Sequence, residues 1–372
     1  MIDLKAELVD LGRRQGFLDV AIAAAEEDRE ARAITLERVR AGSFAGLPWF
    51  DEARAVRATD PRHTLPEARS VVMLAASYGN RLPGRCDGRL RGRVARYAWG
   101  RDYHRVLEKR ARPLARLLAD RVPGERHRLL VDHGPLAERA YARAAGLGWQ
   151  GKNTMLMTRG VGSYTFLAAI LTTAALEPDP PATQSCGACT RCLPACPTGA
   201  LRSGYELVND LCIAHHTIEN RGPIPRALRA KMGDWIFGCD LCQEACPVND
   251  REGPGGLAEF DASDEDAAFP DLVEILALTE PEFHQRFAGR PILRAKYAGL
   301  LRNVCVALGN LGEPDATRPL GRVLDHPQAL VRGHAAWALG RLGSFDPLRA
   351  RLPREGDPWV REEITAALGN AS

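Results

Sequence analysis

The sequence predicts an α+β multidomain protein, because three different patterns follow one another along its 372 residues. Residues 1–176 alternate strand-like apolar runs with helical patterns, residues 177–250 hold eight of the ten cysteines, and residues 286–372 repeat a helical motif. An acidic stretch, residues 251–285, connects the last two regions. A chain of this length is too long for one hydrophobic core, so several domains are expected.

The first region is expected to be an α/β domain. The apolar run at 70–76 predicts a buried strand, and residues 128–131 predict a second strand that ends at Asp132. A helix is then expected over 135–145, with Pro135 in its first turn. In an open α/β sheet, Asp132 would lie at the carboxyl end of its strand, where ligands bind.

Asp132 is compatible with two roles. Aspartate is a favoured N-cap residue, which would explain its place before the expected helix. A carboxyl group screened from water by a large cofactor can instead have its pKa raised toward neutrality and donate a proton. The residue pattern leaves both roles open.

The second region is dominated by two runs of regularly spaced cysteines. The pattern C-x2-C-x2-C-x3-C-P occupies 186–197, and a degenerate copy occupies 212–247. This spacing is typical of bacterial ferredoxin-like domains with two [4Fe–4S] clusters, in which the fourth cysteine of each run ligates the other cluster. Zinc ribbons use isolated C-x2-C pairs, so the triplets favour clusters over a zinc site or disulfides. The predicted ligands are Cys186, Cys189, Cys192 and Cys246 for one cluster, and Cys196, Cys212, Cys239 and Cys242 for the other.

Cys86 and Cys305 remain outside these sets and read as a loop thiol and a buried helix thiol. Eight cluster thiols fit a reducing compartment. Residues 1–30 predict an amphipathic helix, whose acidic residues argue against an export signal. The longest apolar run, 166–176, reads as a buried strand, and no run approaches the ~20 residues of a membrane-spanning helix. We therefore expect a cytoplasmic protein without a membrane partner.

Positive charge is concentrated in one part of the chain, although the formal net charge is only +3. Residues 81–128 hold 15 Lys or Arg residues against five Asp or Glu residues. Tyr97, Trp99 and Tyr103 lie among the arginines, and such a mixture can contact phosphates and stack on bases. An Arg-rich, solvated helix face would give the same composition, so both interpretations remain open.

The last region repeats a helical unit that ends in Leu-Gly. The pairs Leu308-Gly309, Leu339-Gly340 and Leu368-Gly369 are spaced by 31 and 29 residues. Helical units that cannot bury an apolar face alone must stack on their neighbours, and these units resemble short HEAT-like repeats. Such α-helical repeats commonly present a groove to a macromolecule, and a purely packing role is the alternative. The acidic stretch before them is expected to be a solvated, mobile connection.

A glycine-rich segment at 146–153 is close to a phosphate-binding P-loop. Asn153 stands where the Mg²⁺-binding hydroxyl is needed, and a helix rather than a strand is expected before the segment. The segment therefore predicts a cofactor-binding loop, whose backbone N–H groups face an anionic or amide-bearing ligand. A corrinoid motif D-x-H-x-x-G begins at Asp102 and His104 but fails at Leu107, so it supplies no axial histidine.

Seven segments resemble epoxyqueuosine reductases, and the resemblance extends over essentially the whole chain. The segments are Arg57–Pro61, Arg96–His104, Val131–Arg139, Ala145–Thr154, Gly162–Tyr164, Cys212–Glu219 and Gly238–Gln243. The resemblance implies reduction of epoxyqueuosine to queuosine at the wobble position, in the anticodon loop of tRNA. It also implies an N-terminal domain that binds base-off cobalamin, two [4Fe–4S] clusters, and tRNA contacts made by the repeats.

The resemblance also assigns roles to individual residues. It implies that Asp132 is the catalytic proton donor. It places the cobalamin contacts at Arg57, Asp132, Lys152, Asn153, Ser163, Ala214, Cys239 and Asp240. An external low-potential electron donor and a monomeric state are expected. The alternatives are a corrinoid reductive dehalogenase-like enzyme and a non-enzymatic iron–sulfur electron-transfer scaffold.

Overall fold

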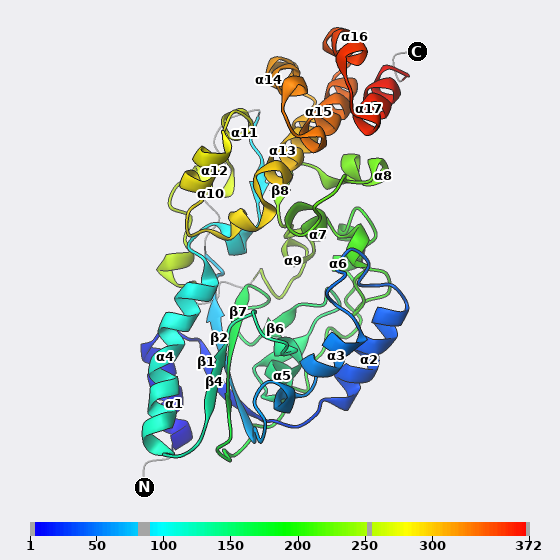
Figure 1. The fold of residues 1–372 in the computed structure, drawn as a ribbon. Coiled ribbons are helices and arrows are strands. Elements are labelled where there is room, and N and C mark those ends of the chain that lie inside the picture. Colours follow the sequence, from blue (N-terminus) through cyan, green and yellow to red (C-terminus); the bar gives the residue numbers. More distant parts are fainter. Residues whose placement is uncertain (1–3, 81–89, 251–254, 370–372) are drawn as a thin grey trace. The chain divides into compact units, whose positions relative to one another are not determined.

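The computed structural model describes residues 4–80, 90–250 and 255–369 (Figure 1). The chain divides into two compact units, each built from three separate segments. Unit 1 consists of residues 1–81, 102–210 and 241–261, and unit 2 of residues 82–101, 211–240 and 262–372. Cys86, expected to be a loop thiol, and the basic residues at 81–89 lie outside the described residues.

Unit 1 is built around a four-stranded sheet in the order β1-β2-β7-β4. The strands are β1 (Asp19–Ala24), β2 (Ser70–Ser77), β7 (Thr165–Thr172) and β4 (His127–Leu130). The three strands predicted from apolar runs are therefore present, with ends that differ by a few residues. β2 and β7 are central and largely buried, which explains their continuous apolar sequences.

The sheet differs from the predicted open α/β sheet, because every pair of neighbouring strands is antiparallel. Asp132 therefore follows an edge strand, and the rule for the carboxyl ends of parallel strands does not place it. Helices α1 (Leu4–Arg14) and α4 (Tyr103–Arg121) cover one face of the sheet, and α5 (Glu138–Ala144) covers the other (Figure 1).

The N-terminal amphipathic helix is shorter than predicted. α1 ends at Arg14, and residues 19–24 form β1 instead of continuing the helix to residue 30. Gly16 has a φ of +86°, a left-handed conformation that is common just beyond the end of a helix. Helices α2 (Arg29–Arg40) and α3 (Glu52–Ala58) follow the strand. Within the described ranges, no helix combines the length and the apolar character needed to cross a lipid bilayer.

A hairpin and two short helices complete the cysteine-bearing part of unit 1. β5 (Gly148–Gln150) pairs with β6 (Leu156–Thr158), so the predicted glycine-rich loop is part of a β-hairpin. A Cβ atom at Gly148 would lie 2.2 Å from the carbonyl oxygen of Met157, which explains the glycine. α6 (Cys192–Ala195) packs against α9 (Leu241–Glu244).

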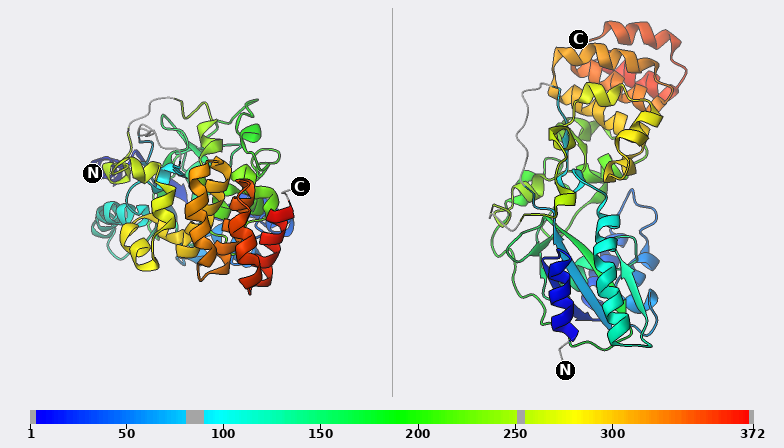
Figure 2. Two further views of the ribbon diagram at one scale, coloured as in Figure 1. Left: turned by 90° about the horizontal axis from the view of Figure 1, so that it is seen from above. Right: turned by 90° about the vertical axis from the view of Figure 1, so that its left-hand side faces the viewer.

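Unit 2 joins a small strand pair to a stack of helices. β3 (Arg93–Val94) is parallel to β8 (Trp235–Phe237), and α7 (Ile213–Ile218) and α8 (Arg226–Arg229) precede β8. The stack consists of α13 (Tyr297–Leu311), α14 (Thr317–Arg322), α15 (Ala329–Arg341), α16 (Asp346–Arg351) and α17 (Pro358–Gly369). α13, α15 and α17 lie side by side and share one hydrophobic core, which confirms the predicted helical repeats (Figure 2).

The Leu-Gly repeat has a packing explanation. A Cβ atom at Gly309 would lie 2.9 Å from Cα of Ala338, and a Cβ atom at Gly340 would lie 2.7 Å from Cβ of Ala367. Such distances are too short for side-chain carbons, so glycine lets α13 approach α15, and α15 approach α17. Each helical unit thereby buries its apolar face on the next one.

The acidic stretch is not the solvated connection that its composition predicts. It forms α10 (Glu265–Ala268), α11 (Leu272–Leu276) and α12 (Glu280–Arg286). Leu272 and Phe283 are buried in the same core as the repeats. The carboxylates of Asp264 and Asp271 cap α10 and α11. Part of the negative charge therefore stabilises helix ends, while the apolar residues between the acids supply a core.

Candidate functional site

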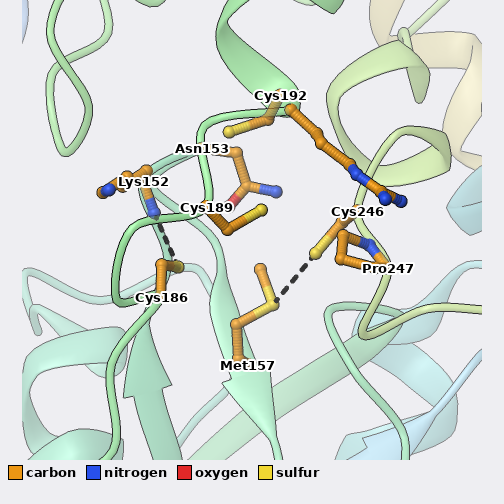
Figure 3. Close-up of a pocket in the computed structure, with 9 residues that line it drawn as sticks. Lys152, Asn153, Met157, Cys186, Cys189, Cys192, Cys246 and Pro247 are labelled. Atoms are coloured by element: carbon orange, nitrogen blue, oxygen red, sulfur yellow. Dashed lines mark hydrogen bonds between the residues drawn. The ribbon is translucent and has the colours of Figure 1, made fainter.

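Four cysteine thiols gather around one pocket in unit 1 (Figure 3). They belong to Cys186, Cys189, Cys192 and Cys246, the ligands predicted for the first cluster. The pocket is completed by Lys152, Asn153, Met157, Arg191 and Pro247. This donor set fits a [4Fe–4S] cluster, because four cysteine thiolates are its usual ligands.

Helix packing brings the two parts of this ligand set together. Cys192 is the first residue of α6, and Cys246 lies two residues beyond the end of α9. Burial raises the pKa of both thiols. Each therefore keeps its proton at neutral pH until a metal displaces it.

The glycine-rich hairpin borders the same pocket. The backbone N–H of Lys152 donates to Sγ of Cys186 over 3.4 Å, and Nζ of Lys152 donates to the carbonyl oxygen of Gly187 over 2.7 Å. Asn153 is buried, and its Nδ2 donates to the carbonyl oxygen of Cys242 over 3.4 Å. Hydrogen bonds to cluster sulfurs help to set a cluster's reduction potential, so this hairpin is placed to influence the first cluster.

The ligands predicted for the second cluster are divided between the units. Cys196 and Cys242 belong to unit 1, whereas Cys212 and Cys239 belong to unit 2. Cys212 immediately precedes α7, and Cys239 is the second residue after β8. Burial alone would raise the pKa of Cys196, but bonds from Thr198 and from backbone N–H groups lower it overall. The convergence of these four thiols stays a prediction.

Asp132 lies at the centre of a polar array in unit 1. The hydroxyl of Tyr103 donates a hydrogen bond to Oδ2 of Asp132, and Nε2 of His104 lies 3.6 Å from the same oxygen. Nδ1 of His104 lies 2.7 Å from Oδ1 of Asp102. Phe166 stacks on the ring of Tyr103, with 4.4 Å between the ring centroids. His104 is therefore held between two carboxylates at the N-terminus of α4.

The proton affinities within this array differ strongly. The hydrogen bond with His104 lowers the pKa of Asp132 to about 2, against the effect of burial and with help from Tyr103. Burial lowers the pKa of His104, but its bonds to Asp102 and Asp132 raise it overall to about 9. The expectation that a large bound cofactor raises the pKa of Asp132 toward neutrality stays a prediction. At neutral pH the proton resides on His104, because the ion pair stabilises both charged groups.

Asp132 is also not a helix cap. α5 begins at Glu138, three residues later than predicted, and its N-cap residue, Ala137, makes no side-chain hydrogen bond. The backbone turns at Asp132, which has a left-handed φ of +55°, several residues before α5 begins. Oε1 of Glu138 accepts a hydrogen bond from the Asp132 N–H over 2.8 Å, and Nη2 of Arg54 donates to the carbonyl oxygen of Gly134 over 2.7 Å. Two side chains thus hold the turn that carries Asp132.

Sequence reasoning missed Tyr103, His104 and Glu138 as members of the site. The spacing D-x-H at 102–104 signals a histidine held by a carboxylate, but no local pattern links it to Asp132, 29 residues from Tyr103. The link is tertiary, because α4 packs against β4 and β7. Burial, and then the charge of Asp132, raises the pKa of Glu138 to about 8.

The other residues that the resemblance assigns to cobalamin lie in both units. In unit 1, Arg57 is exposed on α3, and the buried Ser163 hydroxyl is hydrogen-bonded within the unit. In unit 2, Ala214 lies in α7, and Oδ2 of Asp240 accepts a hydrogen bond from the Arg96 N–H over 2.6 Å. Their role as cofactor contacts stays a prediction.

Two aromatic residues of the basic segment, Tyr97 and Trp99, pack against the core of unit 2 instead of facing outward as a base-stacking surface would require. Trp99 is buried, and its Nε1 donates to the carbonyl oxygen of Val94 over 2.8 Å. Tyr97 packs on Phe237 in the core of unit 2. Apolar rings gain more free energy from burial than from exposure, and this preference outweighs the pattern of neighbouring charges.

Four exposed basic residues of α4 form a stripe along one helix face. Its members are Arg105, Lys109, Arg112 and Arg116, separated by four, three and four residues. Residues with this spacing are neighbours on a helix surface. Nη2 of Arg112 lies 3.7 Å from Glu108, an exposed contact too weak to neutralise the stripe. This basic stripe is a candidate surface for a polyanion.

Three known families match separate parts of the chain. Residues 58–133 match the family described as epoxyqueuosine reductase QueG, DUF1730. Residues 185–249 match a 4Fe-4S double cluster binding domain, and residues 291–369 match HEAT repeats. These matches confirm the iron–sulfur interpretation of the cysteine-rich region and the HEAT-like interpretation of the helical repeats.

Whole proteins are also similar to this chain. The epoxyqueuosine reductase of Bacillus cereus is 32% identical over 375 residues, which cover 98% of this chain and 97% of the relative. The structure of an epoxyqueuosine reductase with an epoxyqueuosine-modified tRNA stem loop is similar at a TM-score of 0.92 and 31% identity, over 99% of this chain and 98% of that chain. A Bacillus subtilis enzyme with its catalytic aspartate loop swung out of the active site matches at a TM-score of 0.92 and 31% identity, over 99% of both chains. Because the similarity spans nearly the full length of these proteins, the chain belongs to the epoxyqueuosine reductase family.

Proposed function

We propose that this protein reduces epoxyqueuosine to queuosine in the anticodon loop of tRNA. Converting the epoxide into an alkene and water consumes two electrons and two protons. Unit 1 holds both kinds of machinery: four cluster thiols around one pocket, and a carboxylate with two proton-bearing partners. The single observation that carries the proposal is the pocket lined by four thiols. The reaction needs a source of electrons, and an iron–sulfur cluster held in this pocket would supply them.

Cobalamin is proposed as the second redox group. A base-off corrinoid would supply a cobalt atom that collects both electrons at one centre. Lys152, Asn153 and Ser163 would help to hold it from unit 1. Nε1 of Trp149 is buried and has no hydrogen-bond partner in the part of the chain that the structure describes. A buried N–H donor on this hairpin supports an amide-bearing ligand beside it.

Asp132 is proposed to pass a proton to the substrate. At neutral pH its carboxylate is ionised, and His104 holds the nearby proton. Oδ2 of Asp132 can take that proton from Nε2 of His104, while Asp102 keeps the imidazole oriented through Nδ1. The Tyr103 hydroxyl donates to the same oxygen and is placed to supply the second proton.

The turn that carries Asp132 is proposed to move during the reaction. In the related Bacillus subtilis enzyme, a catalytic aspartate loop is swung out of the active site. Here the positive φ of Asp132 stores strain, and the contact with Glu138 offsets it in the observed position. Breaking that contact would remove one of the two side-chain hydrogen bonds that hold the turn.

The basic stripe of α4 is proposed to bind the phosphate backbone of tRNA. The stripe begins one residue after His104. It extends over roughly 16 Å, because a helix rises about 1.5 Å per residue. Arginine and lysine displace counterions from several phosphates over this length. A tRNA lying along α4 would bring its anticodon loop toward Asp132.

The proposal is tested by incubating anaerobically reconstituted, reduced protein with tRNA that carries epoxyqueuosine. Mass spectrometry of the nucleoside should show the loss of one oxygen, and Asp132→Asn, the matched control, should show little. Unchanged epoxyqueuosine after full loading with clusters and corrin would contradict the proposal. A chain that takes up clusters but no corrin would favour the electron-transfer scaffold, and turnover of an organohalide alone would favour the dehalogenase-like alternative.

A further inference from the structure

One buried polar residue recurs in each HEAT-like repeat, six positions before the glycine of its Leu-Gly pair. These residues, here called the polar row, are Asn303 in α13, His334 in α15 and Glu363 in α17. None of the three is more than 3% exposed. Buried polar side chains cost free energy unless they are hydrogen-bonded, so their partners indicate what the row does.

All three members of the polar row contact the segment 211–240, which carries Cys212 and Cys239. Nδ2 of Asn303 donates to the carbonyl oxygen of Thr217 over 2.9 Å and to that of Ile236 over 2.8 Å. Asn303 therefore bonds both α7 and β8, the elements that lie next to the two cysteines.

The other two members of the row hold the middle of the same segment. Nε2 of His334 accepts a hydrogen bond from the Ile224 N–H over 3.1 Å. Nδ1 of His334 lies 2.7 Å from the carbonyl oxygen of Leu330 and donates to it, so the imidazole is neutral. Glu363 forms a bidentate ion pair with Arg229, with both N–O distances at 2.8 Å.

Arg302 reinforces the contact of Asn303. Its Nε and Nη2 atoms donate to Oδ1 of Asn303 over 3.0 and 2.9 Å, which fixes the orientation of the amide. Its Nη1 donates to the carbonyl oxygens of Asn220 and Gly222 over 2.9 and 2.6 Å. Arg302 is 1% exposed, so these backbone oxygens replace water around its charge.

The hydrogen bonds continue from Asn303 through Thr217 to Gly238, the residue before Cys239. Thr217, whose carbonyl group binds Asn303, accepts a bond from the Gly238 N–H at its Oγ1 over 2.9 Å. Asp240, on the other side, accepts the Arg96 N–H. A Cβ atom at Gly238 would lie 2.4 Å from Cβ of Ala95, so this backbone has little room to move.

We propose that the polar row of the HEAT-like repeats positions Cys212 and Cys239 as ligands of the second cluster. The repeats then act as a rigid support for an electron-transfer centre, besides any role in binding tRNA. This inference rests on the iron–sulfur part of the proposed function. Asn303 should matter most, because its partners lie five residues from Cys212 and three from Cys239.

The test uses the full chain, reconstituted anaerobically with iron and sulfide, and measures iron content and the electron paramagnetic resonance of the reduced clusters. A Cys212→Ser variant identifies the signal of the second cluster. Asn303→Ala should remove that signal or shift its midpoint potential, with iron falling from about eight toward about four atoms per chain. The signal of the first cluster should stay unchanged.

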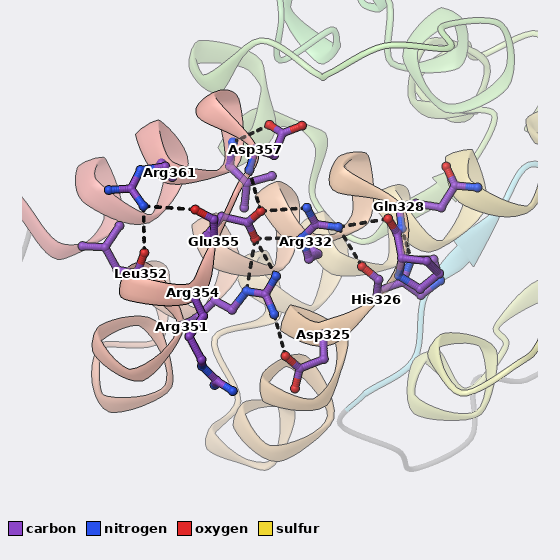
Figure 4. A network of polar contacts seen from close by, with 12 residues as sticks. Asp325, His326, Gln328, Arg332, Arg351, Leu352, Arg354, Glu355, Asp357 and Arg361 are labelled. Atoms are coloured by element: carbon purple, nitrogen blue, oxygen red, sulfur yellow. Dashed lines mark hydrogen bonds and ion pairs between the residues drawn. The ribbon is translucent and has the colours of Figure 1, made fainter.

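Arg332→Gln is the matched control within the repeats. Arg332 pairs with Glu355 and donates to the carbonyl oxygens of His326 and Pro327, all within the repeats (Figure 4). This variant should lower the melting temperature while both cluster signals remain. If Asn303→Ala does not fold, Asn303→Asp is measured in its place. This variant keeps a side-chain oxygen that accepts hydrogen bonds from Arg302, but it loses both N–H donors of the amide.

Two outcomes would overturn the inference. One is an Asn303 variant with both signals and both potentials unchanged. The other is a loss of the second cluster in Arg332→Gln equal to that in Asn303→Ala, which would mean that general stability alone is responsible. The cluster signals do not depend on tRNA, so a failure of the proposed reaction would leave this result intact.

Discussion

The side-chain carboxyl group of Glu138 accepts a hydrogen bond from the backbone N–H of Asp132 over 2.8 Å. It thereby holds a turn in which Asp132 adopts a φ of +55°. A left-handed conformation costs a non-glycine residue roughly 1–2 kcal/mol, which local contacts must offset. Since Glu138 contacts the backbone of Asp132 and not its carboxylate, Glu138 positions the turn without taking part in the proton transfer.

Glu138→Gln should remove part of the pH dependence of stability. Burial, and then the charge of Asp132, raises the folded-state pKa of Glu138 from 4.5 to about 8. The folded state therefore binds this proton more tightly than the unfolded state does, so the free energy of unfolding falls as pH rises between these values. Between about pH 5 and about pH 8, the melting temperature should fall more for the native chain than for the variant. An equal fall in melting temperature in both proteins would contradict this account.

Asp132→Asn should retain both clusters and the corrin but lose most turnover. The amide cannot carry a proton from His104 to the substrate, and removal of a general acid typically costs roughly 10²- to 10⁴-fold in rate. Absorbance spectra of the loaded variant check that the cofactors are present. Near-normal single-turnover reduction by this variant would remove the donor role from Asp132.

His104→Gln should abolish the alkaline limit of the reaction. His104 holds its proton up to a pKa of about 9, because its bonds to Asp102 and Asp132 outweigh burial. The native rate should therefore fall as pH rises through about 9, whereas the variant should be slower, without that decline. Single-turnover rates measured across this range check the prediction. The same alkaline decline in both proteins would show that another group is responsible.

Neutralising the basic stripe should weaken tRNA binding and its salt dependence together. For Arg105→Gln combined with Arg112→Gln, the slope of log K against log salt should flatten by roughly 0.7–0.9 for each phosphate that the variant no longer neutralises. Arg121→Gln is the control, because Arg121 lies on the same helix but pairs with Glu7. Fluorescence anisotropy at several salt concentrations measures both slopes. Indistinguishable slopes for the stripe variant and the native chain would rule this surface out.

Glu355→Ala should destabilise the repeats. Glu355 lies buried between Arg332 and Arg351, with N–O distances of 2.8 and 2.9 Å (Figure 4). Removing one partner of a buried ion pair typically costs about 3–5 kcal/mol. The bond from Arg332 lowers the pKa of Glu355 from 4.5 to about 2. The ion pairs of Glu355 therefore stabilise the repeats fully above pH 4.5, and this stabilisation is lost as pH falls through about 2. Urea unfolding at neutral pH measures the cost, and a negligible change would contradict the prediction.

Local patterns carried much of the sequence-based prediction. The cysteine spacing at 186–197 identified thiols that the fold gathers around one pocket. The Leu-Gly pairs marked three helices that stack through their glycines. The prediction for the acidic stretch was wrong. Its composition suggests a solvated segment, whereas Leu272 and Phe283, which lie between acidic residues, are buried. Composition reports average polarity, whereas burial depends on which face each residue occupies.

The sequence by itself determined the iron–sulfur chemistry and the class of the helical repeats. Cysteine spacing and helical periodicity are properties of neighbouring residues, so the linear order is enough to specify them. Only the tertiary structure decided that the sheet is antiparallel, that Asp132 meets His104, and that Asn303 supports the segment between Cys212 and Cys239. These relationships join residues far apart in the chain, and packing of buried faces, which no local pattern encodes, brings them into contact.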